Sequence, residues 1–312
     1  TLFLVSDISQ AANAESIIIA IGTPVDEYLN PKLDSLLNLF AELYPILSDT
    51  KTIIVRSTVY PGTCEQIKTQ MEREGFKSAA IAYCPERIVQ GKSLQELSSL
   101  PQLVAATDIP TRKRAVKLFS SIAPKTIEVT LKEAELAKLF SNAWRYIQFA
   151  AANQFYMMSE KFGAEFDQIR RAMVDGYGRA ADLPTAGFAA GPCLLKDTLQ
   201  LAAFNDQNFS LGLAAMNVNE NLPNFIVEKI KKTRTIDQTC VGILGMTFKA
   251  NIDDTRDSLS FKLAKLIRFY GGEVICSDAF VSNPSFVSVD ELLDRADVVI
   301  IGAAHHDYEK IE

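Results

Sequence analysis

Short runs of consecutive apolar residues, each about one strand long, alternate with helical patterns through the first 130 residues. These expected strands lie at 16–21, 52–55, 79–83, 103–106 and 126–129. Strands that are apolar throughout are buried on both faces, and strands separated by helices form parallel sheets. The last third repeats the pattern, with expected strands at 239–244, 273–277 and 296–302. The sequence therefore predicts an α/β fold with two Rossmann-like parallel-sheet domains.

The segment between these two halves has a different pattern. No Gly or Pro occurs from Leu131 to about Phe162, and apolar residues recur there every three to four positions. This spacing predicts one long helix that serves as an interdomain spine or a subunit interface. We expect three segments, which are 1–129, 130–222 and 223–312.

Composition excludes several classes of protein. Lys plus Arg number 32 and Asp plus Glu number 38, so the net charge of −6 does not favour nucleic acid. No apolar run approaches the roughly 18 residues of a membrane span, and Thr1–Gln10 lacks the basic residues of a signal peptide. Five cysteines without a C-x-x-C pair suggest a reducing, cytoplasmic location. His305 and His306 stand without a third ligand, so no metal site is expected.

Cys193 is the most informative candidate for chemistry. It follows a loop that includes Gly191 and is expected to open a helix, where the helix dipole favours a thiolate. Asp197 follows four residues later, on the same helix face. A nucleophile and a carboxylate on one face can perform covalent chemistry. The alternative is an inert, buried cysteine beside an exposed aspartate.

Other polar residues gather where ligands bind in open α/β sheets, at the carboxyl ends of strands. These residues are Thr23 and Pro24 after the first strand, Thr58 after the second, and Glu86 and Arg87 after the third. Lys138 and Asn142 share one face of the long helix, although taken alone they are explained more simply by a solvated edge. The loop 248–258 carries Lys249 and Arg256 ahead of a helix and suits a phosphate.

Taken in order, these motifs resemble the UDP-glucose/GDP-mannose dehydrogenase family of nucleotide-sugar 6-dehydrogenases. The resemblance covers nearly the whole chain and rests on Gly22-Thr23-Pro24, Ser57-Thr58-Val59, Pro85-Glu86, Lys138 with Asn142, Cys193 with Asp197, and Phe248-Lys249 to Arg256. It implies oxidation of a sugar C6 alcohol to a carboxylate with two NAD per turnover. The three segments would be an NAD-binding domain, a central helical domain that forms a homodimer, and a UDP-sugar-binding domain.

The resemblance also implies roles for residues. Cys193 would capture the C6 aldehyde as a thiohemiacetal, which is oxidised to a thioester. Asp197 with Thr58 would activate the hydrolytic water, and Glu86 matches a carboxylate implicated in that hydrolysis. Lys138, assisted by Asn142, would stabilise the oxyanions at C6 and favour the Cys193 thiolate.

Further positions match ligand contacts of the family. Arg87, Lys138, Asn142 and Glu86 would contact the substrate together with Arg179, which resembles an arginine supplied by a neighbouring subunit. Phe188, Gly191 and Lys249 would also contact the substrate, Phe188 from a loop that covers the sugar. Thr23, Pro24, Thr58 and Arg256 would contact NAD, the last through a phosphate.

The chain also departs from the family pattern. No G-x-G-x-x-G phosphate loop occurs, so the chain is expected to begin partway through its first domain and, as written, to bind NAD poorly. Gln90 stands where many relatives carry a second carboxylate. Cys193-x-x-Lys196-Asp197 favours a hexose substrate such as UDP-glucose, whereas Pro85-Glu86-Arg87-Ile88 favours an N-acetylhexosamine.

Two alternatives to this activity stay open at this point. One is a non-catalytic nucleotide-sugar-binding protein that has lost the use of NAD. The other is a dehydrogenase of the hydroxyacid or 6-phosphogluconate type, which would need no cysteine.

Overall fold

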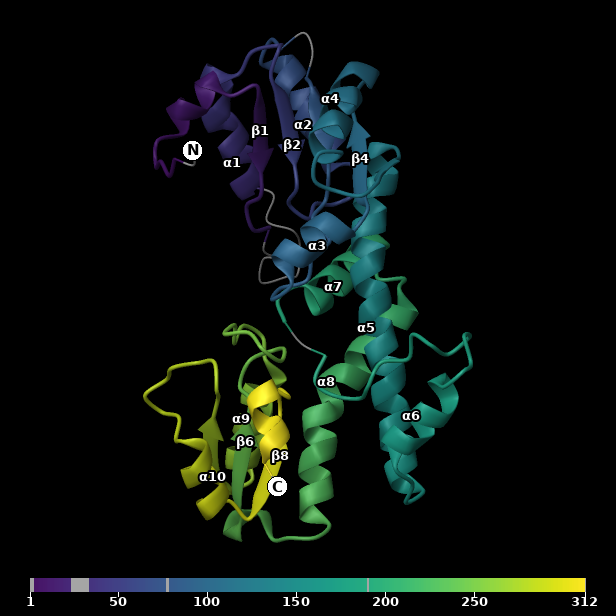
Figure 1. Cartoon of the computed structure of the whole chain (residues 1–312), viewed down its shortest axis with the longest axis vertical. Coiled ribbons are helices and arrows are strands. Elements are labelled where there is room, and N and C mark those ends of the chain that lie inside the picture. Colours follow the sequence, from purple (N-terminus) through teal and green to yellow (C-terminus); the bar gives the residue numbers. More distant parts are fainter. Residues whose placement is uncertain (1–2, 24–33, 77–78, 190, 312) are drawn as a thin grey trace. The chain divides into compact units, whose positions relative to one another are not determined.

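The computed structural model describes residues 3–23, 34–76, 79–189 and 191–311. By packing, the chain divides into two compact units, Thr1–Ser141 and Asn142–Glu312. The division falls inside one continuous helix, α5 (Leu131–Lys161), which confirms the long helix expected from the sequence (Figure 1). The three-segment division stays a prediction.

The first unit alternates strands and helices around one five-stranded sheet. Its strands are β1 (Ser16–Ile19), β2 (Thr52–Val55), β3 (Ile81–Tyr83), β4 (Gln102–Ala106) and β5 (Thr126–Glu128). Its helices before α5 are α1 (Asp34–Leu43), α2 (Thr63–Arg73), α3 (Ser93–Ser99) and α4 (Ile109–Phe119), with short 3-10 turns at Ile8–Asn13 and Tyr44–Ile46. The strands lie in the order β1-β2-β3-β4-β5.

One pairing in this sheet differs from the parallel arrangement that we expected. β3 and β4 run antiparallel, whereas the other neighbouring strands are parallel. The Gln102 side chain at the start of β4 donates a hydrogen bond to the Pro85 carbonyl, just beyond the end of β3, at 3.2 Å. This contact holds the start of β4 beside the end of β3, so the chain returns along the same edge. The α/β fold class is confirmed.

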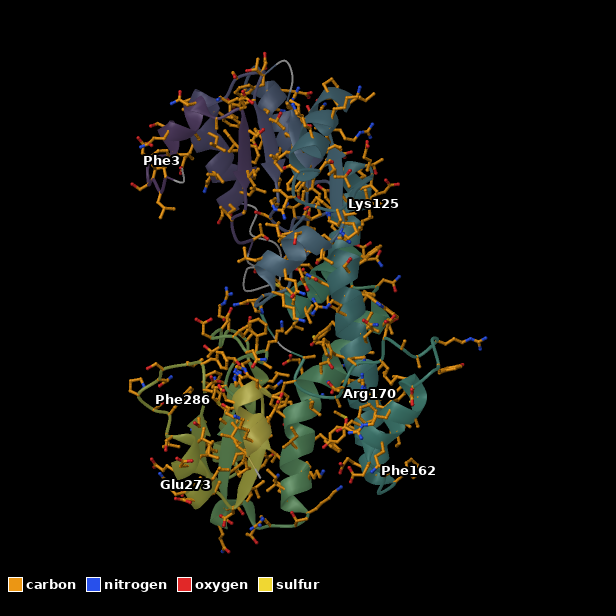
Figure 2. The ribbon with its side chains drawn as sticks, in the orientation of Figure 1. Phe3, Lys125, Phe162, Arg170, Glu273 and Phe286 are labelled. Atoms are coloured by element: carbon orange, nitrogen blue, oxygen red, sulfur yellow. The ribbon has the colours of Figure 1, made fainter. Side chains whose placement is uncertain are left out.

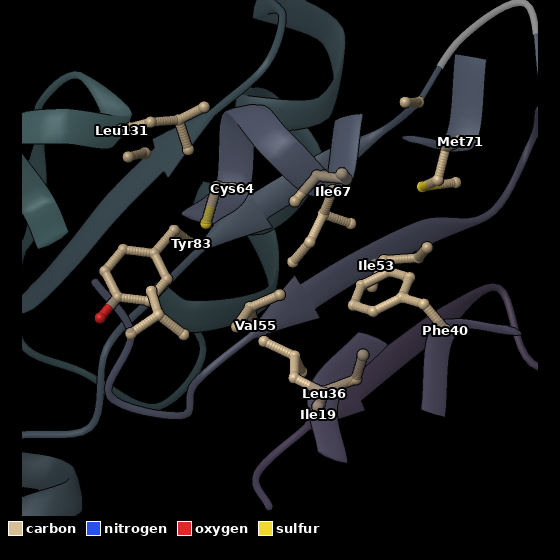
Figure 3. Close-up of a cluster of buried hydrophobic side chains, with 14 of the residues drawn as sticks. Ile19, Leu36, Phe40, Ile53, Val55, Cys64, Ile67, Met71, Tyr83 and Leu131 are labelled. Atoms are coloured by element: carbon tan, nitrogen blue, oxygen red, sulfur yellow. The ribbon is translucent and has the colours of Figure 1, made fainter. Parts of the chain in front are cut away.

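A buried hydrophobic cluster packs α1, α2 and the start of α5 against one face of this sheet, and α4 covers the other face through Ala115 and Phe119. Its members come from β1 to β4, α1, α2 and the start of α5, and Figure 3 labels Ile19, Leu36, Phe40, Ile53, Val55, Cys64, Ile67, Met71, Tyr83 and Leu131. Burying each large side chain of this kind stabilises the fold by about 1.5–3 kcal/mol. The packing therefore holds the carboxyl edge of β1 to β3 rigidly.

A buried carboxylate ties α5 to this packed sheet. Glu135 is completely buried, and its two oxygens accept hydrogen bonds from the backbone N–H groups of Gly62 (2.6 Å) and Cys64 (2.9 Å). Those N–H groups belong to the start of α2, which has no partners of its own for them. Because Thr58 lies in the short loop that leads into α2, this contact also anchors the end of that loop.

The second unit contains helices followed by a small sheet. Its helices after α5 are α6 (Phe166–Val174), α7 (Leu194–Phe204), α8 (Ser210–Lys231), α9 (Leu259–Phe269) and α10 (Val289–Arg295). Its strands are β6 (Cys240–Leu244), β7 (Glu273–Ser277) and β8 (Val298–Ile301), with 3-10 turns at Ile236–Gln238 and His306–Lys310. The three strands lie in the order β7-β6-β8 and are all parallel, and the parallel arrangement is the one that the sequence predicted.

Caps and close contacts set the ends of these elements. Ser258 caps α9, because its hydroxyl accepts from the Ser260 N–H. Gly245, just after β6, has a φ of +86°, and a Cβ there would lie 2.3 Å from the Ala303 carbonyl oxygen. Glycine thus lets the loops after β6 and β8 touch. On α6, Arg170 donates from Nε to the Leu183 carbonyl at 2.9 Å, and so holds the long loop beside that helix (Figure 2).

Part of the surface of α5 is apolar. Phe140, Trp144, Phe155 and Met158 are all exposed, and their spacing places them on one face of the helix. No helix in the described part of the chain has the length and apolar character needed to cross a membrane.

We expect Glu135→Ala to lower the free energy of unfolding by about 1–3 kcal/mol, because two buried N–H groups lose their acceptor. Burial raises the pKa of the Glu135 carboxyl. The folded state therefore binds the proton more tightly than the unfolded chain, whose pKa is about 4.3. The stabilisation is complete below that value and declines as pH rises through the folded pKa.

Urea unfolding of both proteins at pH 4 and pH 7 checks this prediction. The difference in stability between wild type and Glu135→Ala should be larger at pH 4. A difference that grows with pH would contradict burial as the dominant influence on this carboxyl group.

Candidate active site

Cys193 occupies the position predicted for it, immediately before the first residue of α7. It is the N-cap residue, and its side chain makes no capping hydrogen bond. The helix begins there because the loop before it has a glycine at a φ that other residues rarely adopt, Gly191 at +101°. A thiolate at a helix N-terminus is favoured by the helix dipole.

The other cysteines have the opposite environment. All five lie in the described part of the chain, none forms a disulfide, and Cys193 is the exposed one. Burial raises the pKa of the Cys84 thiol to about 12, and burial also raises the pKa values of Cys64, Cys240 and Cys276. The cysteine most suited to act as a thiolate is therefore Cys193.

Asp197 lies one turn into α7 and is only 1% exposed. Its Oδ2 accepts a hydrogen bond of 2.6 Å from the Asn142 amide. The Lys196 ammonium forms an ion pair with Oδ1 at 3.1 Å. This contact does not have the geometry of a hydrogen bond, and Oδ1 accepts none from the described residues. The structure thus contradicts the alternative of a buried cysteine with an exposed aspartate.

Packing inside the second unit explains this arrangement. Tyr146 and Ala150 of α5 form a buried cluster with Leu194 of α7 and Ala215 of α8. This cluster sets the start of α7 against α5 and brings Asn142 to Asp197. Asn142 is 7% exposed, so it belongs to the interior and not to a solvated edge.

A second loop approaches Cys193 from the carboxyl end of β6. A Cβ on Gly191 would lie 2.6 Å from the Phe248 ring, so the Cys193 loop and the 248–258 loop are in contact. Arg256 is exposed and is held by Asp254, which accepts from its Nε and Nη2. These hydrogen bonds raise the pKa of the Arg256 guanidinium, and its interaction with Cys193 adds to the shift. Arg256 therefore lies within electrostatic range of the sulfur.

The remaining predicted residues of this unit lie on loops. Lys249 is half-buried, in the loop after β6. Arg179 is exposed, with its guanidinium 5.9 Å from the centre of the Tyr177 ring. Phe188 packs against the core of the second sheet and lines a cavity of about 520 Å³ whose walls do not include Cys193 or Asp197.

The predicted residues of the first unit gather at the carboxyl edge of its sheet. The Thr23 hydroxyl donates to the Thr58 carbonyl at 2.5 Å, which joins the loops after β1 and β2. Gly22 beside them is exposed, and a Cβ on it would meet no neighbouring atom. An open backbone and two threonines at this edge fit the approach of a dinucleotide. Pro24 lies outside the described residues.

Glu86 has a different environment from the one that its predicted role requires. Its Oε1 accepts from the N–H groups of Arg87 and Ile88, both at 2.8 Å, and its Oε2 pairs with Arg56. These contacts engage both oxygens in holding the loop after β3. Arg87 donates to the Pro101 carbonyl, and burial lowers the pKa of its guanidinium.

The structure thus brings predicted residues together within each unit. In the first, Thr23 joins Thr58; in the second, Asn142, Asp197, Cys193 and Arg256 form one group. Lys138 is half-buried on α5, one turn before Asn142.

Several polar residues that build the site were not predicted. Arg56 is buried, and its Nη1 donates to Gln102 at 3.0 Å while it holds Glu86. Asn153 holds the Gly187 backbone through both amide atoms, at 2.8 and 3.0 Å. A polar side chain on an otherwise apolar helix face was a usable signal for Asn153, because such a residue is costly unless paired.

Metal ligands are not clustered in the part of the chain that the structure describes. No three His, Cys, Asp or Glu side chains there are grouped so as to hold an ion. His305 is buried and hydrogen-bonded to protein groups, among them the Asn251 N–H at 2.8 Å.

Comparison with known proteins places this geometry in a family. Three family models match, and all describe the UDP-glucose/GDP-mannose dehydrogenase family: its NAD binding domain matches residues 1–123, its central domain 132–221 and its UDP binding domain 242–312. The UDP-N-acetyl-D-mannosamine dehydrogenase of Methanocaldococcus jannaschii is 30% identical, over 96% of this chain and 70% of that protein.

Solved structures show the same fold. A UDP-D-ManNAc dehydrogenase from Pyrococcus horikoshii superimposes with a TM-score of 0.90 at 24% identity, covering 99% of this chain and 75% of that one. A UDP-glucose dehydrogenase from Pyrobaculum islandicum gives 0.90 and 24%, covering 99% and 76%.

The fold and these matches define the class as an oxidoreductase that acts on CH–OH groups of nucleotide sugars and uses NAD. More particularly, the chain belongs to the UDP-glucose/GDP-mannose dehydrogenase family. The comparisons give no support to a non-catalytic binding protein.

We expect Asn142→Asp to destabilise the second unit by about 2 kcal/mol at pH 7, because two carboxylates would meet in a buried site. One of the pair must then take up a proton, so the loss should shrink as pH falls toward the unfolded pKa of about 3.9.

Urea unfolding at pH 5 and pH 7 measures this effect. Asn142→Ala is the matched control, since it removes the amide without adding charge and should show no such recovery at low pH. Equal losses for both variants at both pH values would contradict the close approach of residues 142 and 197.

Proposed function

We propose that this chain oxidises C6 of a UDP-sugar twice, from alcohol through aldehyde to carboxylate, with Cys193 as the covalent nucleophile. The observation that carries the proposal is the start of α7. There an exposed cysteine precedes, by one turn, a buried aspartate whose Oδ1 accepts no hydrogen bond from the described residues.

The proposed covalent step begins after the first oxidation. The Cys193 thiolate adds to the aldehyde carbon, which forms a C–S bond and turns the carbonyl oxygen into an oxyanion. Loss of a hydride from that carbon restores the carbonyl as a thioester. Bound NAD supplies the hydride acceptor in each oxidation. Lys138, assisted by Asn142, stabilises the oxyanions through charge and hydrogen bonding.

In hydrolysis of the thioester, the residue that holds the water is Asp197. Its buried Oδ1 is paired with the Lys196 ammonium at 3.1 Å but accepts no hydrogen bond from the described residues, so it can still accept one from a water. A water held there is oriented for attack on the thioester carbon and gives up a proton to Asp197, and we assign Thr58 an assisting role. The C–S bond then breaks, which releases the carboxylate and regenerates the Cys193 thiolate.

For Glu86 we propose a supporting role. Both of its oxygens already have donors, from Arg87, Ile88 and Arg56. A carboxylate whose two oxygens are both hydrogen-bonded is better suited to hold the loop after β3 in place than to activate a water. Its predicted part in hydrolysis would therefore act through the position of that loop.

The preferred substrate that we propose is a UDP-N-acetylhexosamine. Several similar curated proteins are named UDP-N-acetyl-D-mannosamine dehydrogenase, and one from Campylobacter jejuni is 24% identical. The motif Pro85-Glu86-Arg87-Ile88 favours the same branch. UDP-glucose is the second candidate, because Cys193-x-x-Lys196-Asp197 suits a hexose enzyme.

Other ligand contacts follow from the loops. Lys249, Gly191, Phe188, Arg87 and an Arg179 from a second subunit contact the nucleotide sugar. Thr23 and Thr58 contact NAD, and Arg256 binds one of its phosphates. The proposed location is the cytoplasm, consistent with five cysteines outside disulfides.

We propose a homodimer in which the exposed apolar residues of α5 (Phe140, Trp144, Phe155 and Met158) pack against the same residues of a second copy. Trp144 is 57% exposed and Phe155 is 43% exposed on the same helix face. A row of large exposed apolar side chains marks an interaction surface in a protein of this kind. A second copy of the same helix offers the same row in return.

We expect wild-type protein to produce two NADH for each UDP-sugar consumed. Cys193→Ser should lose the second oxidation and lower kcat by about 10³-fold or more, because a serine hydroxyl is not ionised at neutral pH. Absorbance at the NADH band with a panel of UDP-sugars measures both quantities and names the substrate.

Cys240→Ser is the control, and it should keep two NADH per sugar. Unchanged stoichiometry in Cys193→Ser would rule out the covalent mechanism and favour a dehydrogenase without a cysteine nucleophile. Tight UDP-sugar binding with no NADH from any sugar would instead favour the binding-protein alternative.

We expect Trp144→Glu combined with Phe155→Glu to convert the dimer to a monomer, because charges would be buried in an apolar interface. Sedimentation velocity gives the mass in solution. Phe269→Glu, a change at an aromatic residue that is 81% exposed on α9, should leave the dimer intact. A dimer that survives the double substitution would place the interface elsewhere.

A further inference from the structure

A buried imidazole joins three loops at the carboxyl edge of the second sheet. His305 follows β8, is 1% exposed, and contacts residues that follow β6 and β7. In open α/β sheets this edge is where ligands bind. It belongs to the region that matches the UDP binding domain, residues 242–312.

The hydrogen bonds of His305 define its protonation state. Its Nδ1 accepts from the backbone N–H of Asn251 at 2.8 Å, so Nδ1 carries no proton. Its Nε2 therefore carries the proton of the neutral ring. That N–H faces two acceptors, Oδ2 of Asp278 and the hydroxyl oxygen of Thr247, each at 3.2 Å.

Asp278, the partner after β7, is fixed by backbone groups. Its Oδ2 accepts from the N–H groups of Met246 (2.6 Å) and Thr247 (3.2 Å). Its Oδ1 accepts from those of Phe280 (2.8 Å) and Val281 (3.0 Å). The carboxylate thus ties the start of the β6 loop to the β7 loop and offers His305 a rigid anchor.

The same contacts determine the shape of the loop from Thr247 to Asn251. The Thr247 hydroxyl donates to the Lys249 carbonyl at 2.8 Å, so it is available to His305 as an acceptor only. Asn251 has a φ of +60°, which is unfavourable for most residues. The His306 N–H donates to the Asn251 side chain at 2.9 Å and helps to hold this conformation.

Stacking keeps the imidazole ring in one orientation. The Phe280 ring is nearly parallel to it, with centroids 4.7 Å apart and an interplanar angle of 25°. Tyr308 packs against it edge-on at 5.3 Å. With its plane fixed, the ring presents one nitrogen to each end of the loop.

We propose that His305 is the positioning residue of the nucleotide-sugar-binding loop. Its ring clamps residues 247 and 251, and so fixes the segment that carries Lys249. This inference rests on the proposed role of Lys249 as a substrate contact. His305 acts through the loop, and its removal should weaken binding of the nucleotide without stopping the chemistry at Cys193.

Three substitutions separate the functions of the two ring nitrogens. His305→Phe keeps the stacking and removes both hydrogen bonds. His305→Asn keeps an acceptor where Nδ1 lies, and His305→Gln keeps a donor that can reach Asp278. Calorimetry with UDP as the ligand gives the affinity, and NADH assays give KM and kcat.

We expect His305→Phe to weaken UDP binding about tenfold or more, because the loop loses the contacts at both ends. The KM for the UDP-sugar should rise in parallel, while kcat at saturation changes by less than about threefold. His305→Asn should recover most of the affinity, since the Asn251 N–H regains an acceptor.

The matched control is Leu263→Ala, which empties a fully buried position on α9 in a different cluster from the one that holds Tyr308. It should lower the melting temperature at least as much as His305→Phe and leave UDP affinity unchanged. Equal loss of UDP affinity in both variants, or unchanged affinity in His305→Phe, would overturn the proposal.

Nitrogen NMR of the imidazole rings tests the geometry independently of activity. The sequence has two histidines, so His306→Gln assigns the signals. We expect a Nδ1 without a proton and a protonated Nε2 for His305. The opposite tautomer would contradict the Asn251 contact. A wild-type protein that binds UDP but makes no NADH would refute the proposed oxidation and leave this inference standing.

Discussion

The buried carboxylate of Asp197 is the interaction on which the site of the second unit depends. A charge removed from water must be paired, and here Asn142 and Lys196 pair it from two sides. The amide of Asn142 can reach Asp197 because Tyr146 and Leu194 pack the start of α7 against α5. The position of Cys193, one turn earlier, is therefore set by a contact that the cysteine itself does not make. The reactivity proposed for the exposed Cys193 sulfur therefore depends on the buried carboxylate of Asp197.

The same principle recurs at the edges of both sheets. Glu135 satisfies the N-terminus of α2 in the first unit, and Asp278 satisfies four backbone N–H groups in the second. Each carboxylate follows or faces a loop that carries proposed ligand contacts. Because an unpaired buried N–H group is costly, moving such a loop would expose several of them at once. Buried polar contacts, together with the apolar packing beneath them, thus hold these loops so that their side chains are presented in fixed positions.

The sequence was sufficient to predict the elements whose signals are local. The strands are visible as short runs of apolar residues, and the long helix α5 is visible from the spacing of its apolar residues. The motif around Cys193 and Asp197 was readable because four residues make one helical turn. The antiparallel β4 was not predicted, since its direction depends on Gln102 reaching Pro85 across the chain. Arg56 with Glu86, and His305 with Asp278, were missed for the same reason: their partners are 30 and 27 residues away.

The interpretation of the two histidines changes once their neighbours in the structure are known. As adjacent residues in the sequence they could only be weighed as metal ligands. In the fold, His305 is buried. Its Nδ1 accepts from the Asn251 N–H and its Nε2 faces the Asp278 carboxylate, so both ring nitrogens are hydrogen-bonded within the protein. A neutral imidazole can accept at Nδ1 and donate at Nε2, whereas an asparagine amide reaches only the first position and a glutamine amide only the second. That bifunctional geometry, not metal affinity, accounts for a histidine at the point where three loops meet.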